Sequence, residues 1–136
     1  MALYKTNLSP AKADIALLIF RIAIGCMMLV HGIPKLMTLF TADTIEFADP
    51  FGAGETASLT LAVFAEVVCS ILLILGLATR LATIPLIITM CVAVFMVHPV
   101  DGWGRQELGS LYLAAYVLLL IAGPGKYALD YVFKKK

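Results

Sequence analysis

The chain has 136 residues, of which 62% are hydrophobic and 14% charged, and its mean hydropathy is +0.99. Soluble domains are about half apolar and about a quarter charged, so this composition excludes a typical water-soluble domain as well as a disordered chain. A net charge of +1 provides no field that would attract nucleic acid. The three cysteines lack the spacing of a zinc site and cannot all pair. The remaining class is a small integral membrane protein with a single domain over residues 1–136.

Four stretches are long and apolar enough to cross a bilayer, which takes about 20 helical residues. The first follows Ser9-Pro10, a helix-start signal, and the last ends at Gly123-Pro124-Gly125, which cannot continue a helix. Only helices and closed barrels satisfy their backbone in lipid, and the alternating pattern of barrel strands is absent. The sequence therefore predicts an all-α transmembrane four-helix bundle. The predicted spans, in chain order, are residues 15–40, 57–77, 81–97 and 107–123.

Basic residues outside these spans predict the orientation, because loops rich in Lys and Arg stay in the cytoplasm. The loops and tails on one side contain Lys5, Lys12, Arg80, Lys126, Lys134, Lys135 and Lys136. On the other side Arg105 is the single basic residue among five acidic ones. We therefore expect a multi-pass membrane protein with both termini cytoplasmic. The tail KYALDYVFKKK is typical of an interfacial segment, and a frayed, solvated tail is the alternative.

Ionisable side chains within a span are costly in lipid, so they mark candidate sites in the bundle interior. A rise of about 1.5 Å per residue places His31 and Lys35 in the outer half of the first span and Glu66 at mid-depth of the second. His31 and Lys35 are four residues apart and share a helix face. By the same reasoning His98 and Glu107 lie at the outer ends of their spans. The charged groups should therefore meet in the outer half of the bundle.

Two interpretations of this cluster remain open. In the first it forms a ligand-binding pocket, with room provided by a bend at Gly32–Pro34; its predicted lining is His31, Lys35, Glu66, His98, Trp103 and Glu107. In the second the charges are structural, and Glu66 neutralises a basic residue of the first span. Arg21 and Arg80 would then belong to the structural charge pairing.

Other chemistry-bearing residues give weaker signals. Methionines and the two histidines suit Cu(I), but methionine in an apolar span usually serves packing, so we expect no metal. We expect Cys26, Cys69 and Cys91 to be packing residues, since apolar burial raises a thiol pKa. Tyr112 and Tyr116 are candidates for interfacial anchors or pocket lining. No sequence motif assigns a catalytic residue.

A series of motifs resembles the DoxX family of small bacterial membrane proteins. In order these are Arg21, HGIPKL at His31–Leu36, Glu66, LGLATRLA at Leu75–Ala82, Glu107 and GPGKYALD at Gly123–Asp130. The resemblance implies a four-helix inner-membrane protein with cytoplasmic termini and an association with respiratory or oxidative chemistry. Name-giving relatives belong to a thiosulfate:quinone oxidoreductase, and others accompany superoxide dismutase and a sulfurtransferase in a membrane complex. The acidic loop from Thr41 to Ser58 lies outside the family's motifs.

Three functions are compatible with these observations. The first is a redox-associated accessory subunit whose outer-half pocket binds a quinone-like molecule. The second is a small transporter or proton-coupled carrier with Glu66 and His31 as a relay, which would require a homo-oligomer to form a path. The third is a membrane scaffold that docks soluble redox enzymes through Arg80 and the lysine tail. No haem, flavin or iron–sulfur motif is visible, so we expect at most a subunit of an oxidoreductase.

Overall fold

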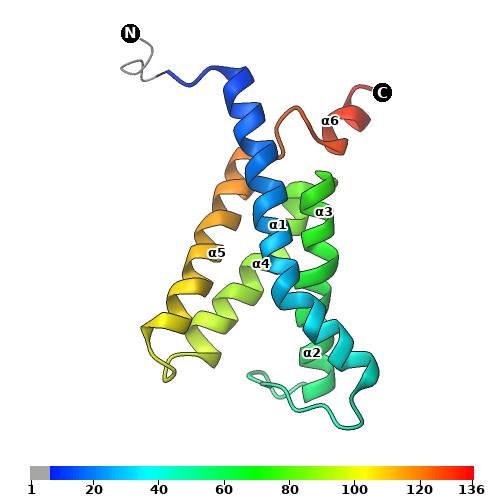
Figure 1. The fold of residues 1–136 in the computed structure, drawn as a ribbon, viewed down its shortest axis with the longest axis vertical. Coiled ribbons are helices and arrows are strands. Elements are labelled where there is room, and N and C mark those ends of the chain that lie inside the picture. The colour runs from blue at the N-terminus through cyan, green and yellow to red at the C-terminus, as the bar shows by residue number, and fades with distance from the viewer. Residues whose placement is uncertain (1–6) are drawn as a thin grey trace.

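The computed structural model describes residues 7–136 and is all-α (Figure 1). Lys5, one of the basic residues used to predict the orientation, lies outside the described residues. Among the described residues, four helices are long and apolar enough to cross a membrane, which confirms the predicted number of spans: Pro10–Thr41, Glu55–Leu75, Thr79–Val97 and Trp103–Ala122. The elements in chain order are α1 (Pro10–Thr41), α2 (Glu55–Val63), the π-helix η2 (Phe64–Cys69), α3 (Ser70–Leu75), α4 (Thr79–Val92), the π-helix η3 (Ala93–Val97), α5 (Trp103–Ala122) and α6 (Leu129–Lys134).

Two helices begin four or five residues earlier than the sequence predicts. α1 starts at Pro10 because Ser9 caps it: the Ser9 hydroxyl oxygen accepts a hydrogen bond from the Lys12 amide at 3.4 Å. α5 starts at Trp103, directly after Gly102. The polar first turn of α5 hides this start from a search for apolar runs. Pro34 lies inside α1 and does not end it.

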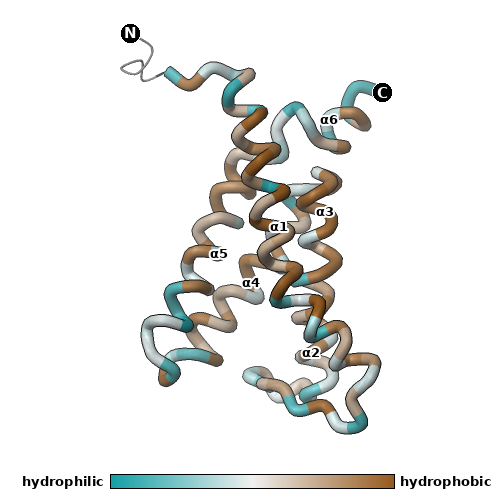
Figure 2. The backbone as a smooth tube through the Cα atoms, in the orientation of Figure 1, coloured by the Kyte–Doolittle hydropathy of each residue, from teal (hydrophilic) through white to brown (hydrophobic). Residues whose placement is uncertain are grey.

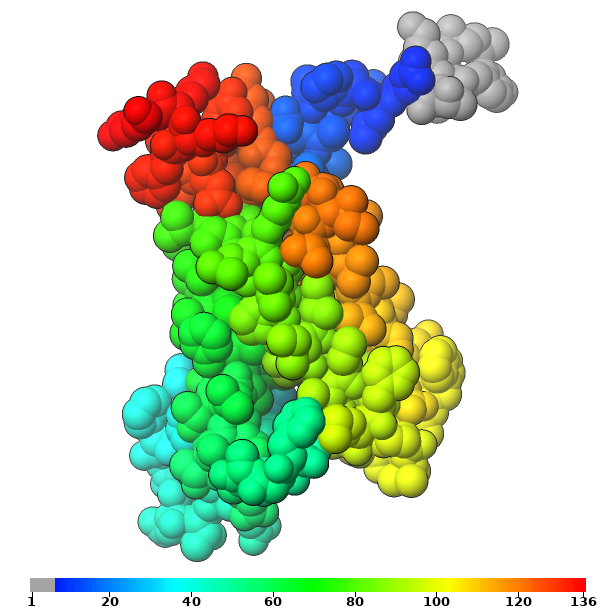
Figure 3. All heavy atoms as spheres, turned by 180° about the vertical axis from the view of Figure 1, so that it is seen from behind, coloured from blue at the N-terminus to red at the C-terminus, as the bar shows by residue number. Residues whose placement is uncertain are grey.

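The spans form two pairs that separate at one end of the bundle. α1 packs along α2–α3 and α4 packs along α5, whereas α1 and α5 have little contact (Figure 1). The beginning of α1 and helix α6 lie together at the opposite end. From behind, the surface is notched between the loop that follows α1 and the junction of η3 with α5 (Figure 3). The two helix pairs are therefore apart at the end of the bundle where the loop after α1 and the η3–α5 junction lie.

Glycines bring α1 close to the second span. A Cβ on Gly32 would lie 2.9 Å from Val67 Cγ2 and 3.0 Å from Glu66 Cβ, and one on Gly25 would lie 2.6 Å from Ile74 Cγ1. The buried face of α1 consists of Arg21, Gly25, Met28 and Gly32. This close approach places the buried face of α1 directly against the π-helix that contains Glu66.

The outer surface of the bundle is apolar. Many large hydrophobic side chains are exposed on all four spans, for example Ile19, Leu61, Leu81 and Leu111. Hydrophilic residues gather at the ends of the bundle and hydrophobic ones along the helices (Figure 2). Such a surface belongs in lipid, where the exposed apolar side chains meet acyl chains in place of water.

Candidate functional site

An ion pair joins the first two spans. Lys35 Nζ donates to both carboxylate oxygens of Glu66, at 2.8 Å to Oε1 and 2.6 Å to Oε2. The Glu66 side chain is 5% exposed and that of Lys35 is 32% exposed, so the carboxylate is the more deeply buried partner. Glu66 lies in η2, and π-helical turns within α-helices are frequent at functional sites. The pairing agrees with the expectation that Glu66 is neutralised from the first span.

The ion pair lies on a cavity of about 120 Å³ between the two helix pairs. Four of the residues predicted to line a pocket do line it: His31, Lys35, Glu66 and His98. They come from α1, η2 and the turn after η3, so residues far apart in the sequence meet here. Met28, Met90, Arg105 and Tyr112 are also among the lining residues.

Two aromatic contacts form one wall of the site. The His31 ring meets Tyr112 edge-on, with 5.8 Å between ring centroids and an interplanar angle of 88°. Tyr112 in turn stacks on Tyr116 at 6.0 Å. Both tyrosines are buried, so neither is an interfacial anchor, and Tyr112 lines the cavity. The tyrosine stack extends from the cavity into the core of the bundle.

Trp103 and Glu107 do not line the cavity, and both are exposed. The reason is the helical register of α5. Arg105, Leu108 and Tyr112 lie at helical spacing on the face that lines the cavity, whereas positions 103 and 107 fall on the opposite face of the helix. Sequence reasoning missed Arg105 because it placed this residue in a loop. Its seven-residue spacing from Tyr112 would have identified it once the helix start was known.

The rim of the cavity contains a second charged group. His98 Nδ1 lies 2.6 Å from Asp101 Oδ2, and the same oxygen lies 3.8 Å from Arg105 Nη1. Asp101 therefore holds the imidazole and the guanidinium next to each other where α4 turns into α5. These groups and the Lys35–Glu66 pair provide donors and an acceptor on opposite sides of the cavity.

Arg21 does not pair with Glu66, which corrects one of the expected pairings. Its side chain is completely buried, and Nη2 donates to the Tyr127 carbonyl at 2.7 Å. A Cβ on Gly76 would overlap Arg21 Nη1, so the guanidinium packs against the turn that joins the second and third spans. Arg21 and Lys35 share a face of α1 but lie near opposite ends of the bundle.

Arg80 makes no ion pair among residues 7–136. Its Nη2 donates to the Ile121 carbonyl at 3.4 Å, and the side chain is exposed. It lies at the end of the bundle where α6 is located, away from the cavity.

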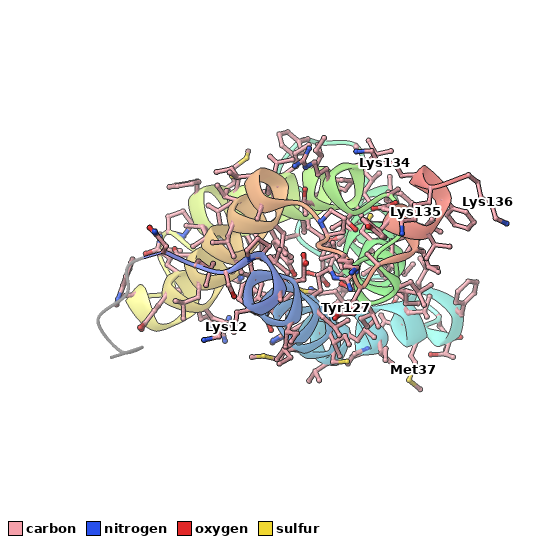
Figure 4. The ribbon with its side chains drawn as sticks, turned by 90° about the horizontal axis from the view of Figure 1, so that it is seen from above. Lys12, Met37, Tyr127, Lys134, Lys135 and Lys136 are labelled. Carbon is pink, nitrogen blue, oxygen red and sulfur yellow. The ribbon has the colours of Figure 1, made fainter. Side chains whose placement is uncertain are left out.

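The C-terminal segment is docked onto the end of the bundle and is not a frayed tail. Asp14 Oδ1 accepts from the Lys126 amide at 3.0 Å, and the Asp130 amide donates to the Gly76 carbonyl at 2.9 Å. The Asp130 carboxylate accepts from the Ala78 amide at 2.6 Å and the Thr79 amide at 2.9 Å, which caps α4. Viewed from above, Tyr127 lies over the end of the bundle between α1 and α3 (Figure 4). Asp130 belongs to the quoted GPGKYALD motif, but its partners are too distant in sequence to identify from spacing.

The loop after α1 is organised by Asp49. Its carboxylate accepts hydrogen bonds from the Ser58 hydroxyl at 2.9 Å and from the amides of Ala53 and Gly54, both at 3.0 Å. The Ser58 hydrogen bond, followed by the backbone amides, lowers the pKa of Asp49 below its usual value. Asp49 thereby fixes the entry into α2.

Within residues 7–136, no group of three or more His, Cys, Asp or Glu side chains is placed to hold a metal ion. The three cysteines are free, with Cys69 buried and Cys26 exposed. The candidate site therefore consists of the cavity, its ion pair and its two imidazoles.

The sequence of this chain is similar to those of several known bacterial proteins. Residues 16–99 match the DoxX family. An uncharacterised protein of Haemophilus influenzae is 36% identical over 124 residues, covering 85% of this chain and 89% of that one. The inner membrane protein YphA of Escherichia coli is 32% identical and covers 88% of this chain and 91% of its own. A Bacillus subtilis protein named "Putative oxidoreductase CatD" is 29% identical, with coverages of 90% and 91%. No solved structure matches the chain.

Proposed function

We propose that this chain, which belongs to the DoxX family and is a multi-pass protein of the inner membrane, is a redox-associated accessory subunit that binds a quinone-like molecule. The observation that carries the proposal is the convergence of His31, His98 and the Lys35–Glu66 pair on one cavity. Apolar walls with a few convergent polar groups are typical of small-molecule sites. The name of the B. subtilis relative supports an oxidoreductase context.

The polar groups suit a quinone headgroup. Its carbonyl oxygens accept hydrogen bonds, which Lys35 Nζ and an imidazole N–H donate. Reduction to the quinol adds electrons from a partner redox protein and a proton to each oxygen. His31 and His98 line the cavity, and an imidazole can pass a proton to a neighbouring oxygen. The residues of this chain therefore hold the headgroup and supply protons, while the electrons come from the partner.

The opening of the cavity suits one ring with an apolar tail, and its volume requires the walls to widen on binding. A cavity of about 150 Å³ holds benzene, and drug-sized ligands need about 300 Å³ or more. At about 120 Å³, the cavity is smaller than one that holds benzene, so a quinone ring requires its walls to move apart on binding. His31 is exposed on α1 although it also lines the cavity. The ring therefore enters beside His31, and the tail remains in lipid between α1 and α5.

We infer further that both termini are cytoplasmic and that the chain is a single domain. α6 and the start of α1 lie at the same end of the bundle (Figure 1). The segments at this end contain Lys12, Arg80, Lys126 and the three lysines at 134–136, in agreement with the positive-inside rule. The cavity then opens toward the extracytoplasmic half of the membrane.

The single tryptophan gives a direct test. Trp103 lies two residues before Arg105, and quinones quench indole fluorescence. Titration of the purified protein with ubiquinone-1 should quench Trp103 saturably. The double variant Lys35→Met/Glu66→Gln, which removes both charges together, should weaken binding at least tenfold, whereas Lys12→Gln should bind as the parent does. Non-saturating quenching, or equal affinity in the double variant, would refute quinone binding at this site.

A proton-coupled carrier is a second candidate, favoured by the stacked tyrosines. Tyr116 is fully buried, and among residues 7–136 its hydroxyl has no hydrogen-bond partner. A chain of hydroxyls from Tyr112 to Tyr116 would lead inward from Glu66. Acidification of the lumen of proteoliposomes that depends on Glu66, without saturable quinone binding, would favour this function.

A further inference from the structure

A second and larger cavity, of about 410 Å³, lies at the end of the bundle where α6 is docked. It is bounded by the first turn of α4, the turn after α5 and helix α6. None of the residues that form the quinone site lines it. The volume falls within the range of small-molecule sites.

The charges of this cavity favour an anion. Arg80 and Lys134 line it from two different elements. Asp130 is the acidic residue among the lining residues, and its two oxygens are occupied by the Ala78 and Thr79 amides at 2.6 and 2.9 Å. Lys135 lies over the ring of Tyr131, another lining residue, at 5.1 Å from the centroid. Positive charge therefore exceeds the available negative charge.

The Arg80 guanidinium has N–H donors that can bind a ligand in this cavity. Among residues 7–136 it makes one side-chain hydrogen bond, to the Ile121 carbonyl at 3.4 Å, which is long for such a bond. A guanidinium carries five N–H donors in a fork that matches phosphate oxygens. Most of these donors are free of protein partners in the described part of the chain.

An apolar surface continues from the polar cavity. Leu81 lines the cavity and is 69% exposed, and Ile84 and Ile88 are exposed on the same face of α4 at helical spacing. Ile121, next to Arg80, is 75% exposed on α5. A free phosphate would use the cavity alone. A phospholipid would occupy the cavity and the apolar surface together. Its headgroup would lie between Arg80 and Lys134, and an acyl chain would lie along Ile84 and Ile88.

We propose that this cavity binds the headgroup of an anionic phospholipid from the leaflet that faces α6. Basic pockets beside membrane spans bind such headgroups, and each basic residue near the surface adds about fivefold to the affinity. The lipid would connect α4 to α6 and stabilise the docked C-terminal segment, because a ligand that binds the folded state stabilises it.

Native mass spectrometry of the full-length protein in dodecyl maltoside tests the proposal. Dioleoylphosphatidylglycerol and dioleoylphosphatidylcholine are added at equal concentration, with and without excess inorganic phosphate. The variants are Arg80→Gln, Lys134→Gln and their combination. Lys12→Gln is the matched control, because it removes one positive charge at the same end of the bundle but on the other side of α1 from α6 (Figure 4).

The expected result is preferential binding of phosphatidylglycerol, about fivefold weaker in each single variant and about 25-fold weaker in the double variant. Lys12→Gln should bind as the parent does, and inorganic phosphate should not displace the lipid. Equal binding of the two lipids, an equal loss in Lys12→Gln, or displacement by phosphate would each overturn the proposal. Lys134→Gln changes an exposed residue in the last turn of α6, so it keeps the test valid if Arg80→Gln lowers the melting temperature of the lipid-free protein.

Discussion

Arg21 Nη2 lies 2.7 Å from the Tyr127 carbonyl, so a buried arginine of the first span holds the C-terminal segment across the end of the bundle. The guanidinium fits there because residue 76, against which it packs, has no side chain. The buried guanidinium of Arg21, which would be costly in lipid, thus anchors the C-terminal segment to the bundle. This explains a buried basic residue that does not pair with Glu66.

Replacing Gly76 by alanine should destabilise the protein by about 1–3 kcal/mol. The new Cβ would overlap Arg21 Nη1 and lie 2.5 Å from Ala128 Cβ, at a backbone φ of 70°. Thermal unfolding in detergent measures the loss. Gly52→Ala separates backbone strain from the contact with Arg21, because Gly52 has nearly the same φ, 68°, but no atom lies within 4 Å of its added Cβ. Equal losses in both variants would show that backbone strain, not the contact with Arg21, sets the cost.

Replacing Asp130 by alanine should cost about 0.5–2 kcal/mol, the usual loss for a helix cap. The amides of Ala78 and Thr79 would lose both acceptors. Hydrogen exchange at these two amides should rise above that in the parent protein. Asp43→Ala, in an exposed loop, is the control. Unchanged exchange would mean that the cap contributes nothing to the order of α4.

Glu66→Gln should reduce stability toward the lower end of the about 3–5 kcal/mol typical of a broken buried pair, since Lys35 is partly exposed. Adding Lys35→Met should recover part of the loss, because no charge is then left without a partner. Melting temperatures of the parent, both single variants and the double variant form the required cycle. Additive losses would indicate that the ion pair has no coupling energy.

The conformation of the loop after α1 should depend on acid pH through Asp49. Its pKa is lowered in the folded protein, first by the Ser58 hydroxyl, below an unfolded value of about 3.9. The stabilisation is therefore complete above the unfolded pKa and is lost as the pH falls through the lower folded pKa. NMR titration of the Asp49 carboxyl carbon measures the midpoint. Ser58→Ala should raise the pKa; an unchanged midpoint would contradict this origin of the shift.

Much of the fold followed from the sequence because lipid restricts the possibilities. Apolar runs of about 20 residues predict spanning helices, and four of the proposed pocket residues do share a cavity. Trp103 and Glu107 do not line the cavity, because the register of α5 turns both to the opposite face of the helix, and the polar first turn hides the start of this helix in the sequence. The docking of Tyr127 and Asp130 could not be inferred, because it depends on contacts between distant segments that no periodicity encodes.

Photoaffinity labelling tests the central claim, quinone binding at the cavity beside His31, most directly. The purified protein is irradiated with an azido-ubiquinone and the labelled peptides are mapped by mass spectrometry, with and without excess ubiquinone-1. Quinone binding at this cavity predicts labels that ubiquinone-1 displaces, confined to the segments around His31, Glu66 and Tyr112. Labels spread over the lipid-facing surface of all four spans, or unaffected by ubiquinone-1, would contradict it.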